Sequence, residues 1–429
     1  MKYNLEIYYL NRENISRIAG NIKGRRELFK KEVEDKVVKI IEDVRKRGDE
    51  ALIEYTKDFD NIVLSKNTIR VGRNEIDDAY NHVNEAQIDA LRTLKDNIER
   101  VEKESFKKMF FEIENDGFKI VQTLKPLDSV GCYIPGGEAS YPSTVLMATV
   151  PAKVAGVDRV AIVTPPKKMS PVLLVAADLA GVNEIYRVGG VQAIAALAYG
   201  TETIRPVDKI VGPGGAYVSV AKAVVSKDVP IDMLAGPSEL IVYADELGDP
   251  EQIVLDLIAQ AEHSSDTLCG LVTTSSNLIE KMLDCMKEYL PASYRRDTVT
   301  ASIEGNGFIV LAEDQKIAIE FINRLSPEHL EIFSKDYERL LEEIKNVGAI
   351  TVNGSSVLTD YYCGINHILP TNGQAKFRGG LSILDFVKVL RTVIAPNNYS
   401  EKTFSVIDQL GRCEGLLNHV KSLSVKYRR

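Results

Sequence analysis

The stretch KIVGPGGAYVSVAKAVV, residues 209–225, decides the fold class of this chain. A short apolar run ends at the glycine-rich GPGG, and a longer segment with apolar residues at helical spacing follows. Strand, tight turn and helix in that order are typical of one unit of a parallel sheet with right-handed crossovers. We therefore predict an α/β protein built on parallel sheets.

Similar units surround this stretch. RVAIVTPP (159–166) and EIYRVGGVQAIAALAYG (184–200) come before it. After AGPSE (235–239), a second series of strands is predicted, with helices between them, at TLCGLVTT, GFIVLAED, HLEIFS and AITVNG. Two α/β layers joined near residue 238 follow from this alternation.

The two ends of the chain are predicted to be helical. Apolar residues recur at helical spacing in the first third, at Val33, Val37, Ile40, Ile41 and Val44, and again at Leu91, Leu94, Ile98 and Val101. The last stretch, from about residue 384, has too few strands to form a domain. Because it cannot bury its own apolar face, we expect it to pack on a second subunit.

Composition bounds the class of protein. The 429 residues suggest two or three domains, with 45% hydrophobic and 27% charged residues. A net charge of -8 gives no electrostatic reason to expect nucleic acid or a membrane as partner. The N-terminus lacks an apolar signal region and no run of eighteen apolar residues occurs, so we expect a cytoplasmic protein. The cysteines are scattered without a CxxC pair and are expected to be reduced and mostly buried: Cys132, Cys269, Cys285, Cys363 and Cys413.

Two glycine clusters mark a candidate ligand site. GPGGAYV (212–218) and VGGVQA (188–193) each follow a predicted strand. At the carboxyl ends of parallel strands, glycine lets backbone N–H groups and helix N-termini approach phosphate. Neither cluster is a GxGxxG fingerprint, and a simple tight turn is the alternative. Two clusters in consecutive units favour a dinucleotide or phosphate ligand.

The chain has only five histidines, and four of them lie near other metal-binding residue types. Gln260 and His263 are three apart on a predicted apolar helix, so one face would carry both. The other pairs are Asp360 with His367 and Glu414 with His419. Mixed nitrogen and oxygen donors suit a divalent metal such as zinc, although histidines with a single hydrogen bond are the alternative. His82 is expected to be an exposed helix or turn residue.

PEHLEIF, residues 327–333, places Glu328 beside His329. The two residues suit an acid/base pair, because imidazole titrates near neutrality and a carboxylate can tune or orient it. Adjacent residues in a strand point to opposite faces, so both serve one site only if the loop before the strand holds them. Pro327 favours that loop. A solvent-facing pair at a strand edge is the alternative.

Several motifs together resemble those of histidinol dehydrogenases. They run in the family's order from about residue 30 to 420: GCYIPGGEASYPSTVLMATVPAKVAGV, VGGVQAIAALAYGTETI, GPGGAYV, IDMLAGPSE, AQAEHSSD, PEHLEI and GINHILPT. The resemblance implies oxidation of L-histidinol to L-histidine in two NAD-dependent steps through the aldehyde, at the end of histidine biosynthesis. It also implies a homodimer with one zinc per subunit and an intertwined C-terminal tail.

The same resemblance implies a domain layout. We expect an N-terminal helical segment (1–28) and two incomplete Rossmann-like domains. The first would consist of 29–132 with 239–383 and carry most zinc ligands, and the second, 133–238, would bind NAD. The helical tail, 384–429, would contribute Glu414 and His419 to a site. In the family, the site that receives these two residues belongs to the partner subunit.

The resemblance also implies which residues form the site, namely those that stand at the matching positions of the family's motifs. The zinc ligands would be Gln260, His263, Asp360 and His419. Substrate contacts would be these four together with Ser238, His329, His367 and Glu414. Cofactor contacts would be Tyr133, Gln192 and Gly215. Since histidinol can chelate zinc, we expect zinc to hold the substrate, His329 to act as the general base and Glu328 to activate water for the second oxidation.

This sequence departs from the family pattern at two places. GPGG replaces the usual GPGN, so Gly215 stands where an asparagine contacts the cofactor. TDYYCGINH replaces the common GDYAAGTNH, which puts Tyr362 and Cys363 beside Asp360. One alternative is a relative that oxidises another small primary alcohol, such as a sulfonated propanediol, although Glu414 would repel a sulfonate. A zinc-stabilised binding protein without catalysis is the other, but its zinc site would be closed and cysteine-rich.

Overall fold

The computed structural model describes residues 5–24, 31–136 and 140–427. These residues divide into two compact units. The first comprises the chain up to Glu102 together with Leu127–Phe386, and the second comprises Lys103–Pro126 together with the chain from Val387 onward. Each unit is described by itself.

The larger sheet of the first unit is entirely parallel. Its strand order is β1 (Glu6–Leu10), β10 (Phe308–Ala312), β9 (Leu268–Thr273), β8 (Glu239–Ala244), β11 (His329–Phe333), β12 (Ala349–Val352). Every residue of β8 and β9 is buried, as expected for central strands covered on both faces. The four strands predicted after AGPSE are confirmed as β9 to β12.

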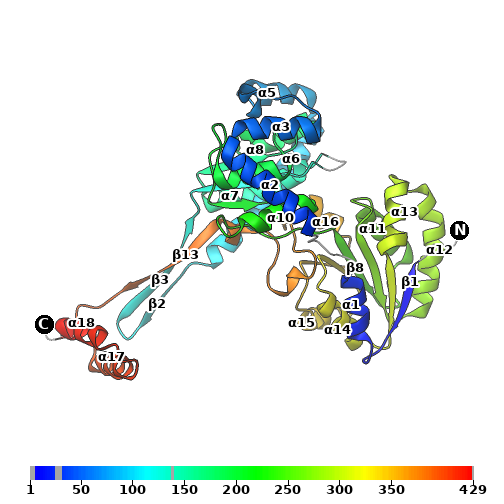
Figure 1. Ribbon diagram of the computed structural model, residues 1–429. Helices are drawn as coiled ribbons and strands as arrows, with labels where there is room; N and C mark the ends of the chain where they lie inside the picture. The colour runs from blue at the N-terminus through cyan, green and yellow to red at the C-terminus, as the bar shows by residue number, and fades with distance from the viewer. Residues whose placement is uncertain (1–4, 25–30, 137–139, 428–429) are drawn as a thin grey trace. The chain divides into compact units, whose positions relative to one another are not determined.

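Helices cover both faces of this sheet (Figure 1). One face shares a core with α1 (Ile15–Lys23) and α14 (Gln315–Leu325). The other face packs against α11 (Pro250–Ala261), α12 (Ser276–Ala292) and α13 (Arg296–Asn306). Shorter elements of the first unit are α15 (Tyr337–Glu343), α16 (Val357–Tyr361), η3 (Gln374–Lys376) and η4 (Ile383–Phe386).

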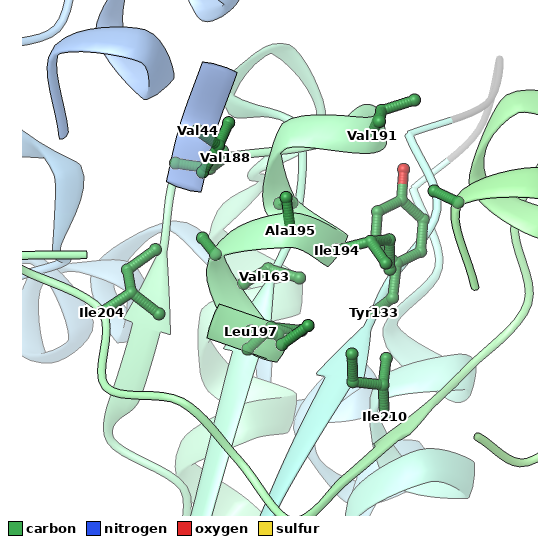
Figure 2. Packing of buried hydrophobic residues seen from close by; sticks show 14 of the residues in the cluster. Val44, Tyr133, Val163, Val188, Val191, Ile194, Ala195, Leu197, Ile204 and Ile210 are labelled. Carbon is green, nitrogen blue, oxygen red and sulfur yellow. The ribbon is translucent and has the colours of Figure 1, made fainter. Parts of the chain in front are cut away.

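The smaller sheet is also parallel. Its order is β6 (Glu184–Tyr186), β5 (Arg159–Val163), β4 (Ser129–Tyr133), β7 (Lys209–Val211). One face shares a core with α2 (Lys31–Arg47), α9 (Gly190–Tyr199) and α10 (Ala216–Val225). Figure 2 shows Ile194 and Leu197 of α9 in this core beside Tyr133. Helix α7 (Pro142–Ala155) packs against β4 and β5, next to α8 (Pro171–Leu179), and η2 spans Pro166–Lys168. The fold class, α/β with two Rossmann-like parallel sheets, is thus confirmed.

Helices α2 (Lys31–Arg47) and α3 (Asp49–Asp60) lie against the smaller sheet. The predicted layout grouped residues 29–132 with the larger one. In the structure the apolar stripe Val37, Ile41 and Val44 of α2 packs into the same core as α9 and α10. An amphipathic helix must bury its apolar stripe against another element, and here the smaller sheet and its helices provide that surface. The following elements are α3 (Asp49–Asp60), α4 (Lys66–Ile69), α5 (Arg73–Ala79), η1 (Tyr80–His82) and α6 (Glu85–Lys108).

The second unit contains an antiparallel sheet and two helices. The strand order is β13 (Val387–Ile394), β3 (Phe118–Pro126), β2 (Phe111–Asn115). The helices are α17 (Glu401–Cys413) and α18 (Leu417–Tyr427). The chain from 384 was predicted to be helical, and β13 corrects this for its first part, where β-branched residues favour a strand.

The N-terminal stretch and the cysteines also differ in part from expectation. Residues 1–28 were predicted to be helical, but EIYYL forms β1 before α1 begins, since aromatic and β-branched residues favour strands. Cys132 and Cys269 are buried, whereas Cys363 and Cys413 are exposed, and all five cysteines are free. None of the helices in the described ranges combines the length and the apolar composition that a membrane span requires.

Candidate active site

Strand β11 begins at His329, so Glu328 lies in the turn that precedes it. This is the arrangement that Pro327 favours. Both side chains are buried, with 7% of Glu328 and 4% of His329 exposed. A buried acid beside a buried imidazole excludes the solvent-facing alternative.

Glu239, the first residue of β8, holds Glu328 in place. The backbone N–H of Glu239 donates to Glu328 Oε2 (2.8 Å), and the backbone N–H of Glu328 donates to Glu239 Oε2 (3.2 Å). Glu239 Oε1 accepts from the backbone N–H of Asn372 (2.6 Å). The sequence analysis missed Glu239, although a glutamate beginning a fully apolar strand right after Ser238 was a visible signal. Ser238 itself is half-buried, and its carbonyl oxygen accepts from Leu268 N (2.9 Å).

The His329 ring has an unused hydrogen-bonding atom. Within the described chain, its buried Nδ1 has no hydrogen-bond partner. Burial, together with the charges of His367 and His263, lowers the pKa of His329 to about 3. The ring is therefore neutral near physiological pH and able to accept a proton. The influence of both charges places His263 and His367, from two other segments, in the neighbourhood of His329.

His367 connects this region to the smaller sheet. Its Nδ1 lies 3.2 Å from the carbonyl oxygen of Asp360, and its Nε2 lies 3.1 Å from Thr144 Oγ1 in α7. With the proton on Nδ1, the Thr144 hydroxyl donates to Nε2. Burial lowers the pKa of His367 to about 4. Thr144 was not foreseen, because no sequence pattern pairs it with a residue more than two hundred positions away.

Two of the three candidate metal ligands of the first unit lie at the end of α11. Gln260 lies in its last turn and is buried. The helix ends at Ala261, so His263 lies in the following turn and not on the helix as predicted. Its Nδ1 is 3.0 Å from the Gln260 carbonyl oxygen. Asp360, in α16, is close enough for the charge of His263 to lower its pKa, although burial dominates and raises it to about 6.

This arrangement fits a borderline divalent cation. A histidine that donates Nδ1–H to a backbone carbonyl keeps Nε2 free for a metal, and second-shell bonds of this kind are usual in zinc sites. Within the described residues, however, no three His, Cys, Asp or Glu side chains are grouped to hold a metal. The first unit supplies one imidazole, one carboxylate and one amide. His419 belongs to α18 of the second unit and is exposed, as is Glu414 after α17.

The candidate cofactor residues gather at the carboxyl ends of the smaller sheet. Tyr133 ends β4, and its hydroxyl accepts from the backbone N–H of Gly190 (3.2 Å). Figure 2 shows this ring reaching toward the start of α9. Gln192 in α9 is fully buried, yet both polar atoms of its amide have no partner in the described chain. A buried unpaired amide is costly, so these atoms fit a polar ligand. Gly215 is exposed at the N-cap of α10.

The candidate residues therefore lie at the carboxyl ends of the strands in the smaller sheet and at the amino ends of the strands in the larger sheet. Tyr133 and the loops after β6 and β7 lie at carboxyl ends, where ligands bind in parallel sheets. Glu328 and His329 lie at the amino edge of the larger sheet, beside the start of β8. His82, as expected, is exposed in η1, where it pairs with Asp78.

Comparison with known proteins identifies the family. The model of the histidinol dehydrogenase family matches residues 23–428. The chain belongs to the histidinol dehydrogenase family. Histidinol dehydrogenase of Oceanobacillus iheyensis is 43% identical over 401 residues, 92% of this chain and 93% of that protein. The Clostridium acetobutylicum protein is 44% identical over 398 residues, 91% of each chain.

Solved structures agree. Histidinol dehydrogenase from Elizabethkingia anophelis superposes with a TM-score of 0.93 at 33% identity, covering 100% of this chain and 99% of that one. An acetylating aldehyde dehydrogenase from Geobacillus thermoglucosidasius reaches 0.50 at 13% identity, covering 86% of this chain and 98% of that one, a likeness of fold alone. Membership of the histidinol dehydrogenase family makes this chain a dehydrogenase.

Proposed function

We propose that this protein oxidises L-histidinol to L-histidine in two NAD-dependent steps through L-histidinal, within histidine biosynthesis. The observation that carries the proposal is the buried Glu328–His329 pair at the start of β11, near enough to His367 and His263 for their charges to act on His329. The pair gives the site two different proton-handling groups. An alcohol oxidation followed by an aldehyde oxidation needs both, because the aldehyde must add water before it can be oxidised.

The residues divide the work as follows. His329, neutral and with Nδ1 unpaired among the described residues, takes the proton of the substrate hydroxyl. Glu328, whose carboxylate is anchored by the Glu239 backbone, activates the water that adds to the aldehyde. His329 collects a proton again in the second step. His367 and Ser238 contact the substrate, and Glu414 pairs with its ammonium group.

Two cofactors complete the proposed site. Gln260, His263, Asp360 and His419 would hold one zinc ion, which supplies a fixed docking point for the substrate. NAD would bind along Tyr133, Gln192 and Gly215 and supply the electron acceptor for both oxidations. The first-unit donors and the unpaired Gln192 amide support these assignments. The domains would be divided accordingly, with NAD on the smaller sheet and most zinc ligands on the larger.

We also propose a homodimer in which the tail serves the partner's site. The second unit leaves large apolar side chains exposed on its strands, its helices and the turn between the helices: Phe111, Ile113, Val389, Leu390, Val393, Ile394, Val406, Leu410, Leu416 and Leu417. Exposed apolar surface of this kind marks an interaction site. Association of two subunits would then complete each zinc ligand set, with Gln260, His263 and Asp360 from one subunit and His419 from the tail of the other.

The test is a count of reducing equivalents. The zinc-loaded protein is given limiting L-histidinol and excess NAD without oxygen, and the NADH formed is counted against the histidine produced. Two NADH per histidinol are expected. One NADH with accumulation of the aldehyde would contradict the water-activating role of Glu328, and none, with zinc bound, would point to another primary alcohol as substrate.

A further inference from the structure

A buried ion pair lies directly beneath the GPGG loop of the smaller sheet. Lys222 of α10 and Asp232 are exposed by only 1% and 0%, and Lys222 Nζ bonds Asp232 Oδ1. Burying two charges costs more than burying apolar residues of similar size, so such a pair adds little stability by itself. Its contacts indicate another role.

The pair holds both backbone polar groups of Gly212, the first residue of the loop. Lys222 Nζ donates to the Gly212 carbonyl oxygen (2.7 Å), and the Gly212 N–H donates to Asp232 Oδ2 (2.7 Å). Asp232 Oδ1 also accepts from the backbone N–H of Met233 (2.5 Å). The lysine thus holds the carbonyl group of Gly212 and the aspartate holds its N–H group, so together they fix the backbone of the turn.

Gly212 requires such support. Its φ of +112° is a conformation that other residues rarely adopt, and an added Cβ would lie 2.1 Å from the Tyr133 carbonyl oxygen. The turn therefore sits against the backbone of Tyr133, whose hydroxyl accepts from Gly190 N. The position of Gly212 decides how the loop leaves β7 and where Gly215 and the start of α10 lie relative to Tyr133.

A second contact extends the clamp to the segment after Asp232. Ser219 of α10 is buried, and its hydroxyl donates to the Ala235 carbonyl oxygen (2.5 Å). Ala235 opens AGPSE, which leads to Ser238 and β8. The glycine loop and the chain that enters the larger sheet are therefore tied to the same helix.

We propose that Lys222 and Asp232 are positioning residues for the cofactor: they act through Gly212 to hold the GPGG loop in its binding conformation before NAD arrives. The inference rests on the proposed use of NAD. Preorganising a loop reduces the ordering cost that binding must otherwise overcome. If a displaced loop loses one or two hydrogen bonds to the cofactor, NADH binding should weaken by about 5- to 30-fold.

The test compares this ion pair with a second, less buried one that joins two strands of the smaller sheet. Lys222→Met and the isosteric double variant Lys222→Met with Asp232→Asn are measured, the latter because it leaves no unpaired buried charge. The control is Arg159→Met with Glu184→Gln, a pair 2.7 Å apart at the first residues of β5 and β6, the edge opposite the loop. NADH binding is followed by fluorescence titration of the zinc-loaded protein, and KM for NAD is compared with kcat.

We expect the two Lys222 variants to lose NADH affinity and raise KM for NAD with a smaller change in kcat, and the control to bind as the parent does. Parent-like affinity in both Lys222 variants would overturn the inference, as would an equal loss in the control. If the parent itself binds no NADH, the proposed function fails instead.

Hydrogen exchange in the unaltered protein gives a result that does not depend on variants folding. Without cofactor, the amides of Gly212 and Met233 should exchange as slowly as those of β7, because the clamp is already closed. Rapid exchange that becomes slow only when NAD is added would overturn the inference.

Discussion

Replacing Gly215 by asparagine should tighten NAD binding. Gly215 has φ −66° and ψ 179°, which any residue adopts, and an added Cβ would meet nothing within 4 Å. At the N-cap of α10, which now has no side-chain cap, Asn Oδ1 can accept a helix N–H while Nδ2 remains free for the cofactor. The cap is worth a few tenths of a kcal/mol over glycine. An amide hydrogen bond to the cofactor contributes about 1 kcal/mol, or about 5-fold in affinity.

The assay is NADH titration of the zinc-loaded protein, with KM for NAD as a second readout. Gly379→Asn serves as the control, because Gly379 is also exposed with room for a Cβ but lies outside the loop. It should leave NADH affinity unchanged. If Gly215→Asn folds and binds NADH no more tightly than the parent, the reasoning that the missing amide weakens cofactor binding is wrong.

Three further predictions concern β11 and the residue that precedes it. His329→Asn should keep the zinc content of the parent and lower turnover by about 10²- to 10⁴-fold, measured by metal analysis and steady-state rates. Glu328→Gln keeps an acceptor for the Glu239 N–H, so it should fold normally and slow oxidation of the aldehyde more than that of the alcohol; equal losses would contradict water activation. Burial and Asp256 raise the pKa of Glu331 to about 8 from 4.5, so the folded state holds a proton that the unfolded chain releases, and the free energy of unfolding should fall as pH rises across that range. Glu331→Gln, which can still accept from Ser356 N, should remove this dependence in denaturant titrations.

The sequence predicted those parts of the fold in which local signals agree. Apolar runs bounded by glycine gave the strands β9 to β12, and Pro327 placed Glu328 before β11. Local sequence signals failed where pairing with a strand distant in sequence determines the secondary structure. EIYYL becomes a strand because β10 offers an edge, and β13 forms by pairing with β3 far away in sequence.

The candidate site shows the same limit. The end of α11 was misjudged because its apolar pattern runs on, while the serines after His263 favour a turn that stops the helix. The bonds of Glu239 to Glu328 and of Lys222 to Asp232 depend on tertiary contacts. A lysine inside the apolar helix AYVSVAKAVV was nevertheless a sign that its charge has a buried partner.

The opposite edges of the two sheets explain why one chain could serve ligands of opposite charge. Helices α9 and α10 begin beside the glycine loops, and helix N-termini carry partial positive charge that favours the phosphates of NAD. Helix α11 ends next to His263, and its C-terminal partial negative charge favours a cation. In the proposed site, zinc would therefore gain from the helix end at the amino edge of the larger sheet and NAD from the helix starts at the carboxyl edge of the smaller. His367 is hydrogen-bonded to both Asp360 and Thr144 and so joins these two regions. In the proposed site, a substrate bound to zinc would then lie close to NAD, and the partial charge of each helix end would attract the ligand beside it.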